Sequence, residues 1–150
     1  MNKLEKHFLI TSFLLSSFLA TANDKNNWEV YYENTQLKIS FRQIQCDFDN
    51  QFDEEFVVFK IENLTSNTFL VQWDSKMWYD ESCINCEQDS PEFRKEIRIE
   101  SGKTMEGNCS EHNALRIFSR FTEILENMPG GDKIITLTKF ELENLNITDE

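Results

Sequence analysis

The sequence predicts an all-β protein, a single antiparallel β-sandwich of about seven strands that is stapled by disulfide bonds. Three observations lead to this fold class. Apolar and polar residues alternate in short runs, the pattern of strands that bury one face. Turn-forming residues separate these runs at intervals of roughly 8 to 15 residues. The chain also carries four cysteines behind an N-terminal export pattern, and an even number of cysteines in an exported chain indicates disulfides.

The central pair of runs occupies residues 56–73. Between the runs, residues 63–67 are rich in Asn, Thr and Ser, whose side chains bond to their own backbone and favour turns. A register that places Ile61 opposite Phe69 directs both apolar faces the same way. We therefore predict a β-hairpin with these buried residues: Val57, Phe59, Ile61, Phe69, Val71 and Trp73.

Alternation elsewhere predicts strands at residues 28–33, 37–46, 93–100, 114–121 and 133–147. In the second of these the apolar positions change from odd to even numbers, so we expect a β-bulge near Arg42 or Gln43. In the last strand the apolar positions change from odd to even numbers in the same way. Residues 114–128 fit a helix as well as a strand, and we predict a strand to about Phe121 followed by a helical turn.

The N-terminus has the three-part pattern of a secretory signal peptide, which we place at residues 1–22. A basic start is followed by an apolar run from Phe8 to Ala20, and Ala20-Thr21-Ala22 is a cleavage motif. The apolar run is shorter than the roughly 20 residues that a spanning helix needs. We therefore expect one domain, residues 23–150, that is exported to the periplasm or the extracellular space without stable membrane insertion after cleavage.

The chain is strongly acidic, with a formal net charge of −12 at pH 7. Nucleic acids and anionic lipids bind to cationic surfaces, so bulk charge argues against both as partners. Cations, metal ions or a basic protein partner remain compatible with this composition.

Six short segments carry a resemblance to a known family. They are Phe59-Lys60-Ile61-Glu62-Asn63-Leu64-Thr65, Val71-Gln72-Trp73, Trp78-Tyr79, Cys83-Ile84-Asn85-Cys86, Gly107-Asn108-Cys109 and Leu115-Arg116-Ile117-Phe118. With these segments, most of the mature chain resembles small exported bacterial immunoglobulin-like proteins of unknown function. The resemblance implies an immunoglobulin-like sandwich in the cell envelope. It implies no catalytic residue, because likeness at the level of the fold does not fix function.

The four cysteines, Cys46, Cys83, Cys86 and Cys109, allow two interpretations. As two disulfides they can pair in three ways, and we expect Cys46 and Cys109 to bond separately to the cysteines of the 83–86 loop. A bridge within that loop would be a redox motif, although no thioredoxin-like βαβ pattern surrounds it. As metal ligands, Cys83, Cys86, Cys109 and His112 match the spacing of a structural zinc site. An oxidising compartment favours the disulfides.

A second metal alternative lies in the acidic segment 47–55. Asp47, Asp49 and Asp53 could bind calcium through carboxylate oxygens, although the spacing of an EF-hand is not met. No arrangement of catalytic residues fits a reaction class, and His112 is the only histidine that would remain after cleavage. We therefore expect a protein that is not an enzyme and has no cofactor.

Trp78 and Tyr79 are the candidates for a recognition surface, since aromatic side chains anchor protein and sugar ligands. Of the two, we expect only Tyr79 to be exposed. The sequence thus predicts an exported, non-enzymatic binding or accessory module of the cell envelope or extracellular space, with an unknown protein or glycan as partner. The alternative is a metal-binding protein that holds zinc or calcium at the residues named above.

Overall fold

The computed structural model describes residues 27–48, 53–87, 90–110, 114–123 and 133–150. The predicted signal peptide, residues 1–22, lies outside these ranges. Among the described residues, no helix is long and apolar enough to cross a membrane. This part of the chain consists mainly of β-strands and loops, with a 3-10 helix at Pro91–Phe93.

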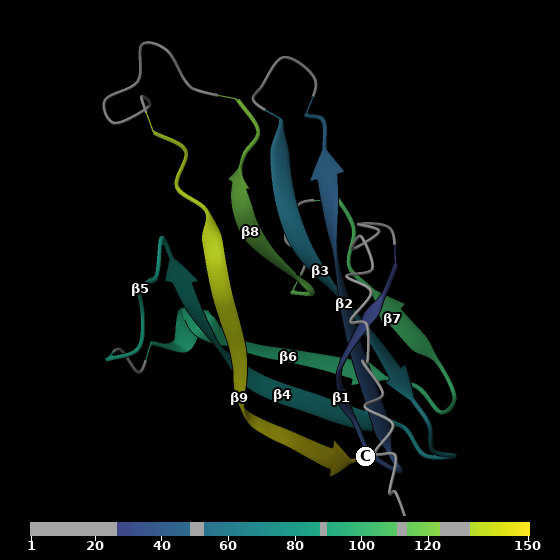
Figure 1. Ribbon diagram of the computed structural model, residues 1–150. Helices are drawn as coiled ribbons and strands as arrows, with labels where there is room; N and C mark the ends of the chain where they lie inside the picture. Colours follow the sequence, from purple (N-terminus) through teal and green to yellow (C-terminus); the bar gives the residue numbers. More distant parts are fainter. Residues whose placement is uncertain (1–26, 49–52, 88–89, 111–113, 124–132) are drawn as a thin grey trace, which may run out of the picture.

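Nine β-strands in the described residues form two antiparallel sheets that pack as a sandwich (Figure 1). The strands are β1 (Glu29–Glu33), β2 (Leu37–Cys46), β3 (Glu54–Asn63), β4 (Phe69–Tyr79), β5 (Ser82–Cys83), β6 (Arg94–Ile99), β7 (Thr104–Glu106), β8 (Arg116–Phe121) and β9 (Leu137–Asp149). In the first sheet the order is β1–β2–β3, and β7 and β8 both pair with β3. In the second, β4 pairs with β9 on one side and with β5 and β6 on the other. The short β5 and β7 account for the difference from the predicted seven strands.

The hairpin predicted over residues 56–73 is wrong. Its two strands, β3 and β4, lie in different sheets, so the segment between them crosses from one sheet to the other. The apolar sets of both strands are buried as predicted, but they face each other across the core instead of standing side by side. Alternation indicates which face of a strand is buried, whereas its hydrogen-bonding partner depends on the rest of the chain.

Asn63 holds this crossing in place from a buried position. Its amide nitrogen donates to the carbonyl oxygens of Asn67 (2.8 Å), Ile99 (3.2 Å) and Glu100 (3.1 Å). Its amide oxygen accepts from the backbone nitrogen and the hydroxyl of Thr65. One buried side chain therefore ties the end of β3 to the crossing segment and to the end of β6.

The hydrophobic core lies between the two sheets and is formed mainly by β2, β3 and β4. The largest of its fully buried side chains is Trp73, which is 2% exposed. Burying a large apolar side chain contributes about 1.5–3 kcal/mol to stability, so this layer provides much of the driving force for folding. The buried members of the core are Leu37, Ile39, Val57, Phe59, Ile61, Phe69, Val71, Trp73, Ile99, Leu115, Ile117 and Leu137.

A second, smaller cluster explains the change of alternation in β2. The bulge predicted near Arg42 or Gln43 is wrong, because β2 pairs with β3 in one unbroken register. Ile44 and Cys46 instead lie on the face of the sheet opposite to Leu37, since side chains alternate along a strand. The cluster on that outer face consists of Trp28, Ile44, Cys46, Phe48, Phe56, Val58, Cys109 and Phe118. The two ends of β2 therefore bury opposite faces.

β7 and β8 form one interrupted strand beside β3. The chain leaves the sheet after Gly107 and returns at Leu115. Phe59 of β3 bonds to both sides of the gap: its N–H donates to the Leu115 carbonyl and its carbonyl accepts from the Gly107 N–H, each at 2.9 Å. This excursion from the sheet brings Cys109 to Cys46 at the end of β2.

The C-terminal part of the described fold follows the sequence prediction more closely. β8 ends at Phe121 as predicted, and most of the helical turn expected after it falls on residues 124–132, outside the described residues. β9 shows the predicted slip: its register with β4 shifts between Gln72 and Asp74, where β9 has an extra residue. Asn144 adopts a φ of 53° at this bulge, a conformation that Asn tolerates better than most residues.

Candidate functional site

A cleft of about 420 Å³ opens at one side of the sandwich, between β1 of the first sheet and β9 of the second. Within the described residues, β1 and β9 each pair with only one neighbouring strand, so the cleft is bordered by two free strand edges. Its volume lies in the range of ordinary ligand sites. The residues that matter for its chemistry are Tyr31, Phe41, Gln43, Val57, Thr138 and Phe140.

Aromatic rings form the inner wall of this cleft. Tyr31 stacks on Phe140 with 5.5 Å between ring centroids, and Phe41 meets Phe140 edge-on at 5.2 Å. Phe59 in the core contacts the same Phe140 ring at 5.3 Å. Each such ring pair contributes about 0.5–1.5 kcal/mol to stability, in addition to the contribution from burying its apolar area. The wall is therefore a pre-formed apolar surface anchored in the core.

Tyr31 reaches from β1 to the edge of β9. The register of β1 with β2 shifts at this residue, since Val30 pairs with Ser40 and Tyr32 pairs with Ile39. The Tyr31 hydroxyl accepts a hydrogen bond from the Leu142 N–H at 2.8 Å. Because successive N–H groups of a strand point to alternate edges, backbone groups of β9 near Leu142 also point toward the cleft side.

Sequence alternation did not identify this role for Tyr31. In the strand predicted at residues 28–33, alternation makes Trp28, Val30 and Tyr32 the buried side. Val30 and Tyr32 are instead exposed, at 54% and 38%, while Tyr31 packs against the core. The signal that was present is a large aromatic residue on the apparently polar side of a short edge strand. Such a residue is typical of a β-bulge, which reverses the face of the sheet to which the following side chains point.

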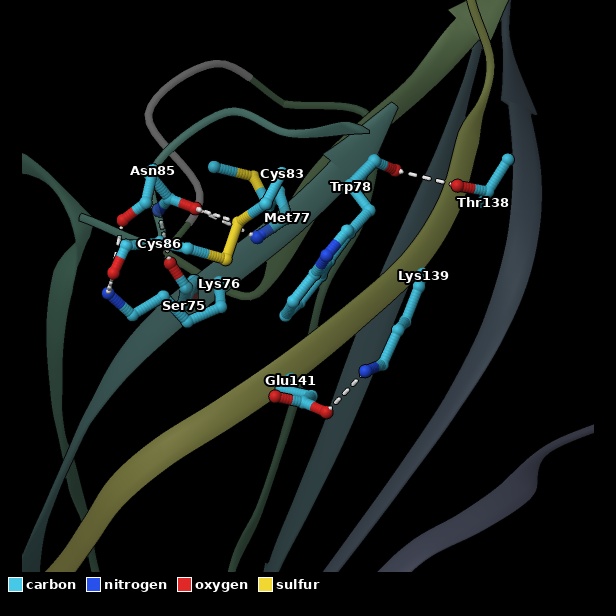
Figure 2. The surroundings of a disulfide bond; sticks show 10 residues. All are labelled: Ser75, Lys76, Met77, Trp78, Cys83, Asn85, Cys86, Thr138, Lys139 and Glu141. Carbon is cyan, nitrogen blue, oxygen red and sulfur yellow. Dashed lines mark hydrogen bonds and ion pairs between the residues drawn. A yellow bond between two sulfur atoms is a disulfide. The ribbon is translucent and has the colours of Figure 1, made fainter. Parts of the chain in front are cut away.

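Trp78, a predicted recognition residue, lies on β4 beside β9 and is half-buried (Figure 2). The Lys139 ammonium lies 4.3 Å from the centre of its ring and also pairs with Glu141 at 2.7 Å. The Trp78 carbonyl accepts from the Thr138 hydroxyl at 3.2 Å. Trp78 therefore supports the stretch of β9 that lines the cleft.

Tyr79 is half-buried instead of exposed, which corrects the expectation from the sequence. Its ring packs against the core, and its hydroxyl donates to the Phe118 carbonyl of the other sheet at 2.6 Å. Burial raises the pKa of Tyr79 to about 12. The side chain therefore links the two sheets and has no free hydroxyl to offer to a ligand.

The raised pKa of Tyr79 predicts a loss of stability in alkali. The unfolded chain loses the tyrosine proton near pH 10, whereas the folded protein keeps it up to about pH 12. Between these values the folded state binds more protons, so the free energy of unfolding falls as the pH rises. We expect Tyr79→Phe to lose about 1 kcal/mol at pH 7 through the missing hydrogen bond and to show a smaller alkaline decrease.

Urea unfolding of the wild type and Tyr79→Phe at pH 7, 10 and 11.5 measures this effect. Tyr32→Phe is the matched control, because the Tyr32 ring is partly exposed and its hydroxyl accepts a local hydrogen bond from the Asn34 amide. The assignment to Tyr79 fails if both variants show the same alkaline decrease as the wild type.

The four cysteines form two disulfides as predicted, but the predicted pairing is wrong. Cys46 pairs with Cys109, and Cys83 pairs with Cys86, with Cα–Cα distances of 5.6 and 5.7 Å. The interrupted edge of the first sheet carries Cys109 to Cys46, whereas the 83–86 loop extends from β4 and β5 of the second sheet. The cysteines proposed for zinc are therefore divided between two bridges, and His112 lies outside the described residues.

The calcium alternative can be followed at two of its three residues. Asp47 and Asp53 are described, and Asp49 lies outside the described residues. The Asp53 carboxylate accepts from the Gln45 amide at 3.1 Å, while its carbonyl accepts from Thr122. Among the described residues there is no group of three or more His, Cys, Asp or Glu side chains that could hold a metal ion.

Comparison with known proteins gives no further guide: no family model, no curated protein and no solved structure matches the chain. The function is therefore inferred from the cleft, the two disulfides and the residues around them.

Proposed function

We propose that the protein is an exported, non-enzymatic binding module with an immunoglobulin-like sandwich, and that it holds an extended segment of a partner protein in the cleft between β1 and β9. The observation that carries this proposal is the pre-formed aromatic wall between two free strand edges. The resemblance to small exported bacterial immunoglobulin-like proteins implies the sandwich and the location in the cell envelope, and it carries no argument for binding.

The strand order supports the immunoglobulin-like assignment. The chain crosses between sheets from β3 to β4, returns after β6 to pair beside β3, and crosses again from β8 to β9 beside β4. A strand that returns to lie beside an earlier, non-consecutive one is the defining feature of Greek-key connections, which immunoglobulin-like sandwiches use.

The two disulfides support export. Disulfides form and persist in oxidising compartments, where reducing systems of the cytosol are absent. They agree with the signal-peptide pattern at residues 1–22, and together the two features favour the periplasm or the extracellular space.

An extended protein segment fits the cleft better than a glycan. A strand added to a sheet edge bonds through its backbone, and its alternate side chains enter pockets beside that edge. On the edge of β9 the Leu142 N–H is held by the Tyr31 hydroxyl, so the alternate backbone groups on either side of it are the ones that would bond the segment. The rings of Tyr31, Phe41 and Phe140 supply an apolar wall for side chains. Sugars lack the regular row of donors and acceptors that a strand edge recognises.

Site-specific photo-cross-linking tests the location of the partner. Gln43 lines the cleft and pairs with Val57, so a photoreactive phenylalanine derivative at this position points inward. Thr148, exposed on the same β9 but outside the cleft lining, is the control position. Irradiation of cultures that secrete each variant should give a protein adduct at position 43 and none at position 148.

A synthetic peptide copied from the cross-linked segment then tests affinity. We expect Gln43→Trp, which fills the cleft, to weaken binding at least tenfold, about 1.4 kcal/mol, while Thr148→Trp leaves it unchanged. Circular dichroism verifies that both variants are folded. Equal adducts at both positions, no adduct at position 43, or unchanged affinity of folded Gln43→Trp would each reject the cleft as the binding site.

A further inference from the structure

The Cys83–Cys86 disulfide closes a short loop at the end of the β4–β5 hairpin (Figure 2). β5 pairs with the end of β4, with Cys83 opposite Trp78. The next residue continues the contact, since the Ile84 N–H donates to the Met77 carbonyl at 3.0 Å. Only two residues separate the cysteines, so reduction of this bridge releases a far smaller loop than reduction of Cys46–Cys109.

The two disulfides differ in access. Cys86 is exposed and Cys83 is half-buried, whereas in the other bridge Cys46 is 1% exposed and Cys109 is half-buried. Cys86 also lines a hollow of about 340 Å³ that Lys76, Asp74 and Arg94 border. Thiol–disulfide exchange requires a thiolate to approach one sulfur, so access favours the 83–86 bridge as the reactive one.

Hydrogen bonds hold the loop independently of its disulfide. Asn85 is 1% exposed; its amide nitrogen donates to the Ser75 carbonyl at 2.7 Å, and its amide oxygen accepts from the Met77 N–H at 2.9 Å. Both partners belong to β4. We therefore expect the loop to keep its shape after reduction, with both thiols close enough to form the bond again.

The surroundings of the two sulfurs are not equivalent. The Lys76 ammonium donates to the backbone carbonyls of Asn85 and Cys86, at 3.0 and 3.2 Å, so it holds a cation on the loop backbone at Cys86 and not at Cys83. A nearby cation stabilises a thiolate. The Cys83 sulfur lies 4.0 Å from the Asn85 amide oxygen, an acceptor that suits a protonated thiol. Cys86 is therefore suited to be the sulfur that a partner thiolate attacks, and Cys83 to be the sulfur that leaves.

We propose that the Cys83–Cys86 bridge is a redox-active disulfide that exchanges with a dithiol of an exported partner protein. A partner thiolate attacks the Cys86 sulfur, the bond between Cys83 and Cys86 breaks, and Cys83 leaves with the electron pair and takes up a proton. The second partner thiolate attacks the partner's own sulfur in this mixed disulfide and releases Cys86 as a thiolate. The partner dithiol is oxidised to a disulfide, and the Cys83–Cys86 bridge is reduced to a dithiol.

This inference goes beyond the binding function proposed above and does not depend on it. The site belongs to a β-hairpin, and in the described part of the chain no α-helix begins beside it as one does at the cysteines of thioredoxin-like proteins; here Lys76 supplies the positive charge. Lys76 is thus a positioning residue that acts through Cys86.

The first test uses reduced glutathione as the probe and the full exported chain. Aliquots are quenched by alkylation, and peptide mass spectrometry assigns each labelled cysteine. We expect Cys83 and Cys86 to become labelled at least about tenfold faster than Cys46 and Cys109, because Cys86 is exposed whereas Cys46 is buried and Cys109 is half-buried. The circular dichroism spectrum should remain native during this reduction. Equal rates for both bridges, or loss of the native spectrum as Cys83–Cys86 opens, would show a structural bridge instead.

The second test compares Cys83→Ser with Cys86→Ser, each of which leaves one free thiol in the loop. The probe is a synthetic peptide that carries an intramolecular disulfide. We expect Cys83→Ser to form the mixed disulfide through Cys86 at least about tenfold faster at pH 7 than Cys86→Ser forms it through Cys83. The reverse order, or equal rates, would reject the assignment of Cys86 as the exchanging sulfur.

The same assay measures the part played by Lys76. In the Cys83→Ser background, Lys76→Met should slow exchange at pH 7 but not at pH 10, where the thiol ionises without help, and Lys76→Arg should restore the rate. A rate loss that is equal at both pH values would indicate distortion of the loop and would remove Lys76 from the proposal.

Discussion

Replacing both Cys46 and Cys109 with alanine should lower the free energy of unfolding by about 4 kcal/mol. The two residues are separated by 63 positions, so their bond removes much of the freedom of the unfolded chain. In the folded state this bridge fastens the excursion between β7 and β8 to the end of β2. It also belongs to the apolar cluster on the outer face of the first sheet, so its loss leaves a gap among Phe56, Val58 and their neighbours.

Urea unfolding followed by tryptophan fluorescence measures this loss, and the other bridge supplies the matched control. The double variant Cys83→Ala, Cys86→Ala removes a bridge between cysteines that are only 3 positions apart in the sequence. It should lower the free energy of unfolding by about 2 kcal/mol. The two double variants remove the same chemical groups, so the difference between them isolates loop length and surroundings. Equal losses, or a larger loss for the 83–86 variant, would contradict this division into a stabilising and an exchanging disulfide.

The cysteine pairing shows where sequence reasoning stops. The count and the export pattern predicted two disulfides, and both are present. Which cysteines meet depends on the gap in the strand beside β3, because that gap carries Cys109 across to Cys46. A strand that leaves a sheet and returns to the same line has no periodic signature, so spacing along the chain could not reveal the pairing.

The strands illustrate the same limit. Alternation located the core residues of β3 and β4 correctly, because burial on one face imposes a period of two. It could not distinguish a hairpin from a crossing between sheets, since both bury the same residues and both need turn-forming residues between them. In the folded chain the crossing segment is held by Asn63, whose side chain bonds to the end of β6, a contact between residues that are far apart in the sequence.

The cleft was beyond sequence analysis for a related reason, whereas a redox motif within the 83–86 loop was considered from the sequence and disfavoured because no thioredoxin-like pattern surrounds it. Tyr31, Phe41 and Phe140 come from three strands and meet only when the sandwich forms. The two places are also linked: Thr138 lines the cleft, and its hydroxyl accepts from the Glu81 N–H in the β4–β5 turn and donates to the Trp78 carbonyl. One short stretch of β9 therefore borders the cleft and supports the hairpin that carries Cys83.

Gly107→Ala should lower the free energy of unfolding by about 3 kcal/mol, near the upper end of the usual cost of overpacking. A Cβ atom at this position would overlap the Leu115 carbonyl oxygen and would lie 3.0 Å from the Leu115 carbonyl carbon and 3.1 Å from the Val58 Cβ. The Leu115 oxygen cannot move away freely, because it accepts the hydrogen bond from the Phe59 N–H. The clash therefore falls at the point where the interrupted strand closes beside β3.

Gly102→Ala is the matched control. Gly102 has a φ of 63°, but a Cβ atom there meets nothing within 4 Å, so its cost is limited to about 1 kcal/mol of left-handed backbone strain. Hydrogen exchange adds a local measurement: Gly107→Ala should expose the Phe59 amide to exchange, and Gly102→Ala should leave it protected. If both variants lose the same stability and keep Phe59 protected, the close approach of Gly107 to Leu115 is not what joins β7 and β8 to β3.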